Sequence, residues 1–542
     1  MSLMTADKTS WHCLPAEIRI LVLEALLQDS CSLAGFATVS REWQMIIERH
    51  NFTRIKLTSS RLADFGLIIH RNRALVRYIW LCLELREYDC TLCAPHVLEM
   101  MGMSNADSTL IITAFLELFS TLSAWEPNGN LLLDISVHSP SDSEHWFKYL
   151  TFGPDIPSDK CDRGLCEEQS MLVKLDDHQH GWIAGSQDST PPPAGINKVF
   201  DEIMGEGPFD NDEQENQWWQ QLPLVPVVTG VLLRQQNRRR WRPTALAQMF
   251  ARLPRLQEFY YEPWREWCDT LQRWTDQCEC CSVSSLFSAM YAFVAILLTA
   301  DNLSILVFDI AFQSLFESLA SSQLRRLTLF ENFNQQYPLR FTASFFGCDP
   351  IRIPTSDVSR AVAKASLELE HLSASFIVDA SYFFHTREPS WKWPSLTSLA
   401  LTSRLLAPDE SPTEIDNMLQ TAAAAAMKMP NLETMEIWNG REGLAMLFRY
   451  QLTRGGRPAV ITWRGTWEFT LRPPVAQAWE AVALKHHGHG SVIVRELLDA
   501  GAVVKSHGDA IHHLKLLNPV IRPVSLQQIQ MEHRICSGVH NW

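Results

Sequence analysis

Residues 394–401 read Pro-Ser-Leu-Thr-Ser-Leu-Ala-Leu, with leucines at positions 396, 399 and 401. The last two leucines are two residues apart, so they point to the same side of an extended chain, as in a strand with one buried face. The same spacing, Leu-x-x-φ-x-φ with φ an apolar residue, recurs along the chain and predicts a series of similar short strands. The further copies are Leu75/Tyr78/Trp80, Leu256/Phe259/Tyr261, Leu303/Leu306/Phe308, Leu324/Leu327/Leu329 and Leu432/Met435/Ile437, with a degenerate copy at Leu369/Leu372.

Helical stretches lie between these strands, at residues 111–122, 358–367 and 415–427. A helix, a turn and a short strand form the unit of a leucine-rich-repeat stack, in which each repeat covers the apolar face of the previous one. The spacing between copies is uneven and the Asn or Cys ladder position is missing. The sequence therefore predicts an α/β fold class with an irregular leucine-rich-repeat-like stack. An ordinary α/β domain with parallel strands is the alternative.

Composition favours a soluble globular protein without a basic surface field. The 542 residues are 46% hydrophobic and 20% charged, and 47 basic against 61 acidic residues give a net charge of −14. This charge argues against binding to nucleic acid or to an anionic membrane. The first residues contain no apolar core of signal-peptide length, and 13 cysteines without regular spacing indicate reduced thiols. We expect a cytoplasmic or nuclear protein.

One uncharged segment, Ser282 to Ala300, has the minimum length for a membrane span. Five of its residues are Ser or Thr, and no cluster of Lys or Arg flanks it. We expect a buried helix and no membrane association. For residues 275–312 a membrane anchor and an atypical insertion stay open as alternatives to a buried helix and strand.

The segment from 151 to 221 is strongly acidic. Residues 151–220 contain 15 acidic and 4 basic side chains, and we interpret Pro191–Pro193 and the run 210–216 (DNDEQEN) as breakers of regular structure. The segment is predicted to be a partly ordered insertion. A basic cluster follows, and we interpret it as a solvated helix face that balances the acidic insertion, with a localisation signal as the alternative. The cluster consists of Arg234, Arg238, Arg239, Arg240 and Arg242.

The N-terminus carries the most specific motif, Leu-Pro-Ala-Glu-Ile at 14–18, followed by LAGFATVSREW at 33–43. Pro15 suits the first turn of a helix, where the missing N–H costs nothing. Two apolar stripes follow on that helix and predict burial on two sides. Fewer than about fifty residues rarely close a core alone, so this apolar surface indicates a partner. The stripes are Ile18/Leu21/Val22/Ala25/Leu26 and Ile20/Leu23/Leu27.

These residues resemble the F-box, specifically that of fungal F-box proteins with a repeat-like C-terminal region. The family pattern is Leu-Pro-x-Glu-Ile, a helix, a central Leu, then Val-Ser-Arg-x-Trp and an apolar pair, here Ile46 and Ile47. The resemblance covers about forty residues and implies a three-helix module that docks on the Skp adaptor of a cullin-RING ubiquitin ligase. The adaptor-binding residues that it implies are Leu14, Pro15, Glu17, Ile18, Ile20, Leu23, Leu33, Val39 and Trp43.

The predicted organisation has six parts. They are a disordered tail (1–10), the F-box (11–57), a first repeat-like α/β segment (58–150), the acidic insertion (151–221), the irregular leucine-rich-repeat-like region (222–475) and a C-terminal helical cap and tail (476–542).

The sequence carries no recognised catalytic or cofactor motif. The sequence contains no G-x-S-x-G, H-E-x-x-H or G-x-x-x-x-G-K-[ST] motif. The Cys-x-x-Cys pairs 90/93 and 278/281 are far apart, and we assign them no histidine ligands and no shared metal site. Cys161 and Cys166 are predicted to be free thiols. Surface positions are predicted for the histidines, at 486, 487, 489, 507, 512 and 513.

Three functional hypotheses follow. The first is a non-catalytic substrate receptor of an SCF-type ubiquitin ligase, which binds the Skp adaptor through the F-box and a protein target through the repeat-like region. It needs no cofactor, because other subunits transfer the ubiquitin. The second is an F-box protein in a non-ligase assembly or trafficking complex. The third is an enzyme without a recognised motif.

Overall fold

The structure is a computed structural model. It describes residues 11–536 except 12–13, 29–32, 34, 95–102, 128, 156–175, 205–206, 210, 266–310, 321, 336–350, 454–456, 500 and 502. Several predictions fall outside the described residues. They concern the tail 1–10, the segment 282–300 with nearly all of 275–312, the triplet at 303–308 and the pairs Cys161/Cys166 and Cys278/Cys281.

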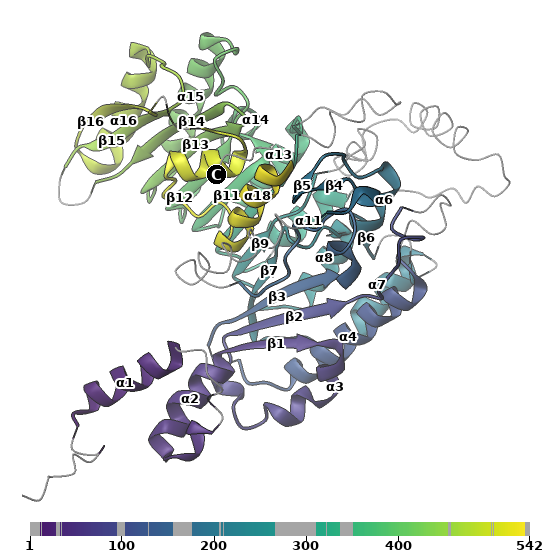
Figure 1. Cartoon of the computed structure of the whole chain (residues 1–542). Coiled ribbons are helices and arrows are strands. Elements are labelled where there is room, and N and C mark those ends of the chain that lie inside the picture. The colour runs from purple at the N-terminus through teal and green to yellow at the C-terminus, as the bar shows by residue number, and fades with distance from the viewer. Residues whose placement is uncertain are drawn as a thin grey trace, which may run out of the picture.

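A twelve-stranded sheet forms the centre of the protein (Figure 1). Its strands follow one another in chain order, and every neighbouring pair from the first strand to β13 is parallel. The bounds are β1 Arg54–Thr58, β2 Tyr78–Glu84, β3 Leu131–His138, β7 Val228–Leu233, β9 Glu258–Tyr261, β10 Arg326–Phe330, β11 His371–Asp379, β12 Ser398–Thr402, β13 Thr434–Arg441, β14 Leu444–Gln451, β15 Ala459–Gly465 and β16 Ser491–Leu497.

Helices between successive strands cover one face of this sheet, and their buried side chains share one core with the strands (Figure 1). They are α3 Ser59–Ile68, α4 Asn105–Ser123, α7 Asp212–Gln221, α8 Pro243–Ala251, α11 Ala311–Ala320, α13 Ser356–Ala365, α14 Ala380–His385, α15 Pro412–Ala426 and α16 Pro473–His487. The α/β class is confirmed, and so are the predicted helices, which became α4, α13 and α15.

The apolar triplets lie in register across β9 to β13. Leu327 pairs with Phe259 on one side and Leu372 on the other, and Leu399 pairs with Leu372 and Met435. All five side chains are buried in the core beneath the helices. The prediction of strands from this spacing is confirmed here, including the degenerate copy in β11.

In β2 the prediction of which residues face the main core is wrong by one position. Ile79 and Leu81 face the helices, whereas Tyr78 and Trp80 form a separate cluster with Cys82 on the opposite face. Strand β2 reads YIWLCLE and has apolar residues on both sides. A strand buried on both faces has no alternation from which to read the orientation.

The parallel order ends after β13. Only Glu442 and Gly443 separate β13 from β14, and Gly443 has a positive φ of 74°. A loop this short can only reverse the chain, so β14 is antiparallel to β13, and β15 is antiparallel to β14. Helix α16 then returns the chain to β16, which is parallel to β15. The predicted helical cap at 476–542 therefore also contains a strand.

The last two helices, α17 His507–Leu514 and α18 Pro523–Cys536, cross to the other face of the sheet. There Ile511 and Ile529 contact the strand residues that alternate with the triplets, such as Phe330 and Trp438. Over β10 to β14 the sheet thus has helices on both faces.

The described part of the acidic segment contains two helices. Pro193 begins α6 (Pro193–Val199), and Asn211 caps α7 by accepting a hydrogen bond from the Gln214 amide at 3.0 Å. The acidic residues after Asn211 occupy the first turn of α7, where the helix dipole favours negative charge. Both supposed breakers therefore begin helices, because proline and acidic residues are favourable in a first turn. Smaller elements lie before, within and after the acidic segment. They are η5 Pro140–Ser143, η7 His178–His180, β4 Trp182–Ile183, β5 Ser186–Gln187, β6 Glu202–Ile203 and β8 Arg240–Trp241.

Within the described part of the chain, α4 is the one helix that is long and apolar enough to cross a membrane by length and composition. Its buried residues include Phe115, Phe119 and Leu122, which belong to the core beneath the sheet. A core helix passes the same test, so the length and composition of α4 are not evidence that it crosses a membrane.

Replacement of Leu399 by Ala tests the stacked core. Leu399 is fully buried between Leu372 and Met435, so its truncation should cost about 2–5 kcal/mol of unfolding free energy. The matched control is Leu484→Ala on α16, where the leucine is 51% exposed. Denaturant unfolding should separate the two variants clearly. Equal midpoints would contradict the packing described above.

Candidate functional site

The N-terminal residues form a small helical module beside the first edge of the sheet (Figure 1). It consists of α1 (Ala16–Gln28), the 3-10 turn η2 (Phe36–Thr38) and α2 (Arg41–Thr53). The described residues thus contain two α-helices and one turn in place of the three helices that the F-box resemblance implies. Residues 54–57, expected within the F-box, belong to β1, so α2 runs into the sheet without a linker.

The module has a small aromatic centre. The Trp43 ring lies between those of Trp11 and Phe36, at centroid distances of 5.2 and 6.1 Å. The Glu42 carboxylate accepts from the Trp11 indole at 3.1 Å and pairs with Arg19 at 2.9 Å, which ties α1 to α2. Trp43 therefore packs within the module, although the resemblance assigns it to adaptor binding.

Most of the apolar surface of α1 is not covered by the described chain. Leu23 is 1% exposed, but Ile18 is 43%, Leu21 59% and Val22 45% exposed. Among the described residues, the predicted burial of α1 on two sides is therefore not seen. Among the predicted adaptor-binding residues, Leu23 is buried, and Leu33 and Trp43 are half-buried. The other six are exposed: Leu14, Pro15, Glu17, Ile18, Ile20 and Val39.

Three of the five arginines of the basic cluster after β7 are buried, and Arg240 and Arg242 are half-buried, which contradicts the prediction of a solvated helix face. Arg234, Arg238 and Arg239 are each at most 4% exposed. Each pairs with a carboxylate from another segment. Arg234 pairs with Asp134 of β3 at 2.8 Å, Arg238 with Glu532 of α18 at 2.6 Å, and Arg239 with Asp142 of η5 at 2.5 Å. A buried guanidinium is stable only with such a partner, so these arginines connect the middle of the sheet to its surroundings.

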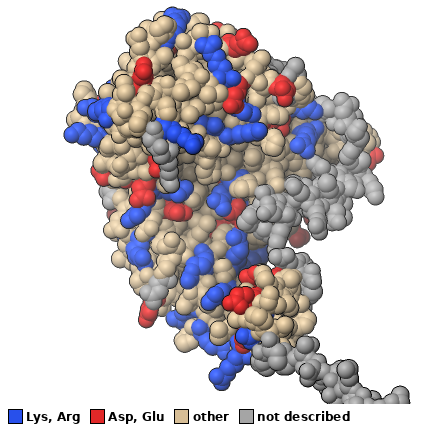
Figure 2. Space-filling view, turned by 90° about the vertical axis from the view of Figure 1, so that its left-hand side faces the viewer, with Lys and Arg blue, Asp and Glu red and all other residues tan. Residues whose placement is uncertain are grey.

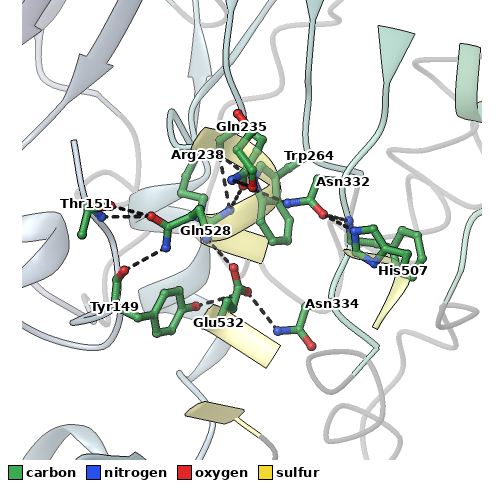
Figure 3. A network of polar contacts seen from close by, with 12 residues as sticks. Tyr149, Thr151, Gln235, Arg238, Trp264, Asn332, Asn334, His507, Gln528 and Glu532 are labelled. Atoms are coloured by element: carbon green, nitrogen blue, oxygen red, sulfur yellow. Dashed lines mark hydrogen bonds and ion pairs between the residues drawn. The ribbon is translucent and has the colours of Figure 1, made fainter. Parts of the chain in front are cut away.

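Arg238 stands at the centre of a polar network between the sheet and α18 (Figure 3). Its guanidinium lies 3.9 Å from the centre of the Trp264 ring and bonds Gln235 as well as Glu532. Two branches extend from this centre. The Asn332 amide donates to Gln235 at 2.9 Å and its oxygen contacts His507 Nε2 at 2.8 Å, while Asn334 donates to Glu532 at 2.9 Å.

Burial shifts the pKa of the titratable groups in and beside this network. It lowers the pKa of His507 well below the usual value, with a further contribution from His533, so His507 is neutral. It also raises the pKa of Glu262 to about 7, although hydrogen bonds from Ser525 and the Arg522 amide oppose this. The predicted surface position of His507 is therefore wrong, because its ring stacks on Phe333 at 4.3 Å inside the protein. These groups bond one another, and we interpret the network as a lock that holds α17 and α18.

Sequence reasoning also missed a cluster at the carboxyl ends of β2 and β3. His145 and His180 lie beside Cys90 and Cys93, to which we had assigned no histidine ligands. Sequence spacing could not show this, because the histidines come 55 and 87 residues after their cysteine neighbours. Among the described side chains, Cys90, His145 and His180 form one of two groups with metal-ligand chemistry, and Cys93 joins the first group through its contact with His180; the second group is Cys82, Glu84 and His138.

Charge on the surface is mixed where it can be seen. On the face in Figure 2, basic side chains are separated by acidic and uncharged ones. This face offers no continuous basic field of the kind that holds a nucleic-acid backbone.

Comparison with known proteins gives little functional information. Residues 318–522 match the model of a family of unknown function, DUF6546. This match begins in α11 and ends just before α18, so it covers the second part of the stack and excludes the N-terminal module. No curated protein and no solved structure matches the chain.

Disruption of the Arg238–Glu532 pair tests the lock. Removing one partner of a buried ion pair leaves an uncompensated charge, so Arg238→Met and Glu532→Gln should each destabilise by about 3–5 kcal/mol. In the double variant the cost should be smaller than the sum of the two. The exposed pair Arg360–Glu388 is the matched control, and breaking it should cost at most about 1 kcal/mol. If the loss of unfolding free energy in the double variant equals the sum of the two single losses, Arg238 and Glu532 are not coupled.

Acid should weaken the lock through His507. The folded protein keeps this imidazole neutral, whereas the unfolded chain takes up a proton below about pH 6.5, so its contribution to stability is lost as the pH falls. His507→Gln removes this uptake. The stability gap between wild type and variant should therefore narrow by up to about 1.4 kcal/mol per pH unit below about pH 6.5. Thermal unfolding of both proteins across this range measures it, and a constant gap would contradict the assignment.

Proposed function

We propose that this protein is a non-catalytic substrate receptor of an SCF-type cullin-RING ubiquitin ligase. In this proposal the F-box-like module binds the Skp adaptor, and the irregular leucine-rich-repeat-like stack presents a protein target. The observation that carries it is the exposed apolar surface of α1, on a segment whose sequence has the F-box pattern. Apolar residues gathered on a protruding helix are typical of a surface that a partner covers.

The architecture behind the module supports the second half of the proposal. The strands from β1 to β13 are parallel and in chain order, with their helices on one face, which is the arrangement of a repeat stack. Because α17 and α18 cover the other face over β10 to β14, a target would contact the loops, the ends or these helices rather than the bare sheet. Catalysis would belong to other subunits, and this receptor would raise the local concentration of the target.

Adaptor binding can be tested on exposed residues, so that binding and stability are separated. Ile18 and Val22 are one helical turn apart on α1 and are 43% and 45% exposed. If they are anchors, each truncation should cost about 1–2 kcal/mol of binding energy, and Ile18→Ala/Val22→Ala should weaken binding at least about tenfold. Titration of purified Skp adaptor against the full chain measures this.

The control is Leu67→Ala on α3, because Leu67 is 81% exposed and lies outside the module. It should bind the adaptor as wild type does, and all three proteins should melt at similar temperatures. Equal adaptor affinity in wild type and the α1 variant would refute the proposed interface. Capture of the adaptor without a cullin subunit would refute the ligase role alone.

A further inference from the structure

Two cysteines and two histidines converge beside the carboxyl ends of β2 and β3. Cys90 Sγ lies 3.6 Å from His145 Nδ1, and Cys93 Sγ lies 3.5 Å from His180 Nε2. The donor atoms of Cys90, His145 and His180 all lie within 4.8 Å of one another. The imidazole rings of His145 and His180 are 4.9 Å apart, so the two cysteine–histidine pairs form one cluster.

The second nitrogen of each ring is held by an acceptor. His145 Nε2 lies 3.2 Å from the Tyr88 carbonyl oxygen, and His180 Nδ1 lies 2.8 Å from a carboxylate oxygen of Asp177. A carbonyl and a carboxylate accept the ring proton at these positions, which leaves the lone pair on the nitrogen that faces the cysteine. Outer contacts of this kind orient the histidine ligands of metal sites.

We propose that Cys90, Cys93, His145 and His180 form a structural zinc site. In tetrahedral zinc sites the Zn–S and Zn–N bonds measure about 2.3 and 2.0 Å, which places bound sulfur and nitrogen atoms roughly 3.5 Å apart. The two sulfur–nitrogen distances given above have this value. Four protein donors leave no open position, so the site suits a structural rather than a catalytic ion.

The surroundings also fit a structural ion. His145 and His180 are 8% and 3% exposed, whereas Cys90 is exposed and leaves a path from solvent. The turn after His180 is fixed by Gly181, which has a φ of 70° and whose Cβ, if present, would lie 2.1 Å from Ser189 Oγ. On binding, each thiol would give up its proton and the thiolate would bind the ion.

Such a site would join three segments that are distant in sequence. These are the turn after β2, the segment after η5 and the short helix η7, which directly precedes the hairpin of β4 and β5. Beneath it lies a separate apolar cluster that includes Tyr149, Trp182 and, from α18, Met531. The zinc ion would thereby stabilise the layer against which α18 packs. This inference is independent of the proposed adaptor binding.

The second group of donors, Cys82, Glu84 and His138, is less suited to a metal. Glu84 lies 3.7 Å from the Lys56 ammonium group, whose positive charge opposes a cation there. The His138 ring stacks on Phe152 at 3.8 Å. This group offers one cysteine and one histidine, whereas the first group, with Cys93 at 3.5 Å from His180, offers two of each. Cys82 therefore serves as a cysteine control.

The test is the metal content of the full-length protein, purified under reducing conditions, loaded with zinc and freed of excess metal. Cys90→Ser/Cys93→Ser and His145→Gln/His180→Gln should each bind about one zinc ion per chain fewer than wild type. Cys82→Ser and His178→Gln should retain the wild-type content, since His178 is exposed and only two residues from His180. Equal zinc content in wild type and both double variants would overturn the proposal. Zinc bound by other cysteines would contribute equally to all of these proteins and would not affect the comparison.

Cobalt(II) provides a second measurement that does not need the variants to fold. Wild-type protein loaded with cobalt should show thiolate-to-cobalt charge transfer and the intense visible bands of tetrahedral coordination. Chelation of zinc should also lower the melting temperature of wild type and leave a folded Cys90→Ser/Cys93→Ser variant unchanged. An octahedral cobalt spectrum without charge transfer would mean that the four side chains are only hydrogen-bonded to one another.

Discussion

Three buried guanidinium groups after β7 fix the positions of much of the protein. Each must have a carboxylate next to it, because an unpaired charge in the interior costs several kcal/mol. Arg234, Arg238 and Arg239 obtain these carboxylates from β3, α18 and η5. The loop after β7 is therefore tied to β3, to the C-terminal helix α18 and to the segment that follows β3. Hydrophobic burial alone would not specify these contacts so narrowly, because it is not directional.

Around this centre the sheet is assembled from neighbours in sequence. Each strand up to β13 pairs with the strand before it, and each helix covers the groove beside its own strand. Contacts of this kind are local, so periodicity was enough to predict β9 to β13 and the helices α4, α13 and α15. The prediction failed in β2, where both faces are apolar. Periodicity also gave no prediction of the two-residue turn at Gly443, which ends the parallel order.

The features that sequence reasoning missed depend on distant partners. Arg238 and Glu532 are 294 residues apart, and Arg234 and Asp134 are 100 apart. The sequence shows five arginines near an acidic segment, and the burial of three of them depends on carboxylates brought by the fold. The same holds for Cys90 and Cys93, whose histidine neighbours belong to later loops. A cysteine pair can suggest half of a metal site, but only the topology brings the other half to it.

The N-terminal module and the two C-terminal helices are both joined directly to the sheet. At the first edge of the sheet, α2 stops at Thr53 and β1 starts at Arg54, so no flexible residues separate the module from the sheet. Over the middle of the sheet, Arg238 after β7 and Asn332 and Asn334 after β10 hold α17 and α18 against the sheet through Glu532 and His507. If an adaptor binds α1, this continuous construction would hold a target at a fixed distance and orientation from it. A receptor that acts by proximity gains from such rigidity, because a short and defined separation raises the effective concentration more than a loose tether does.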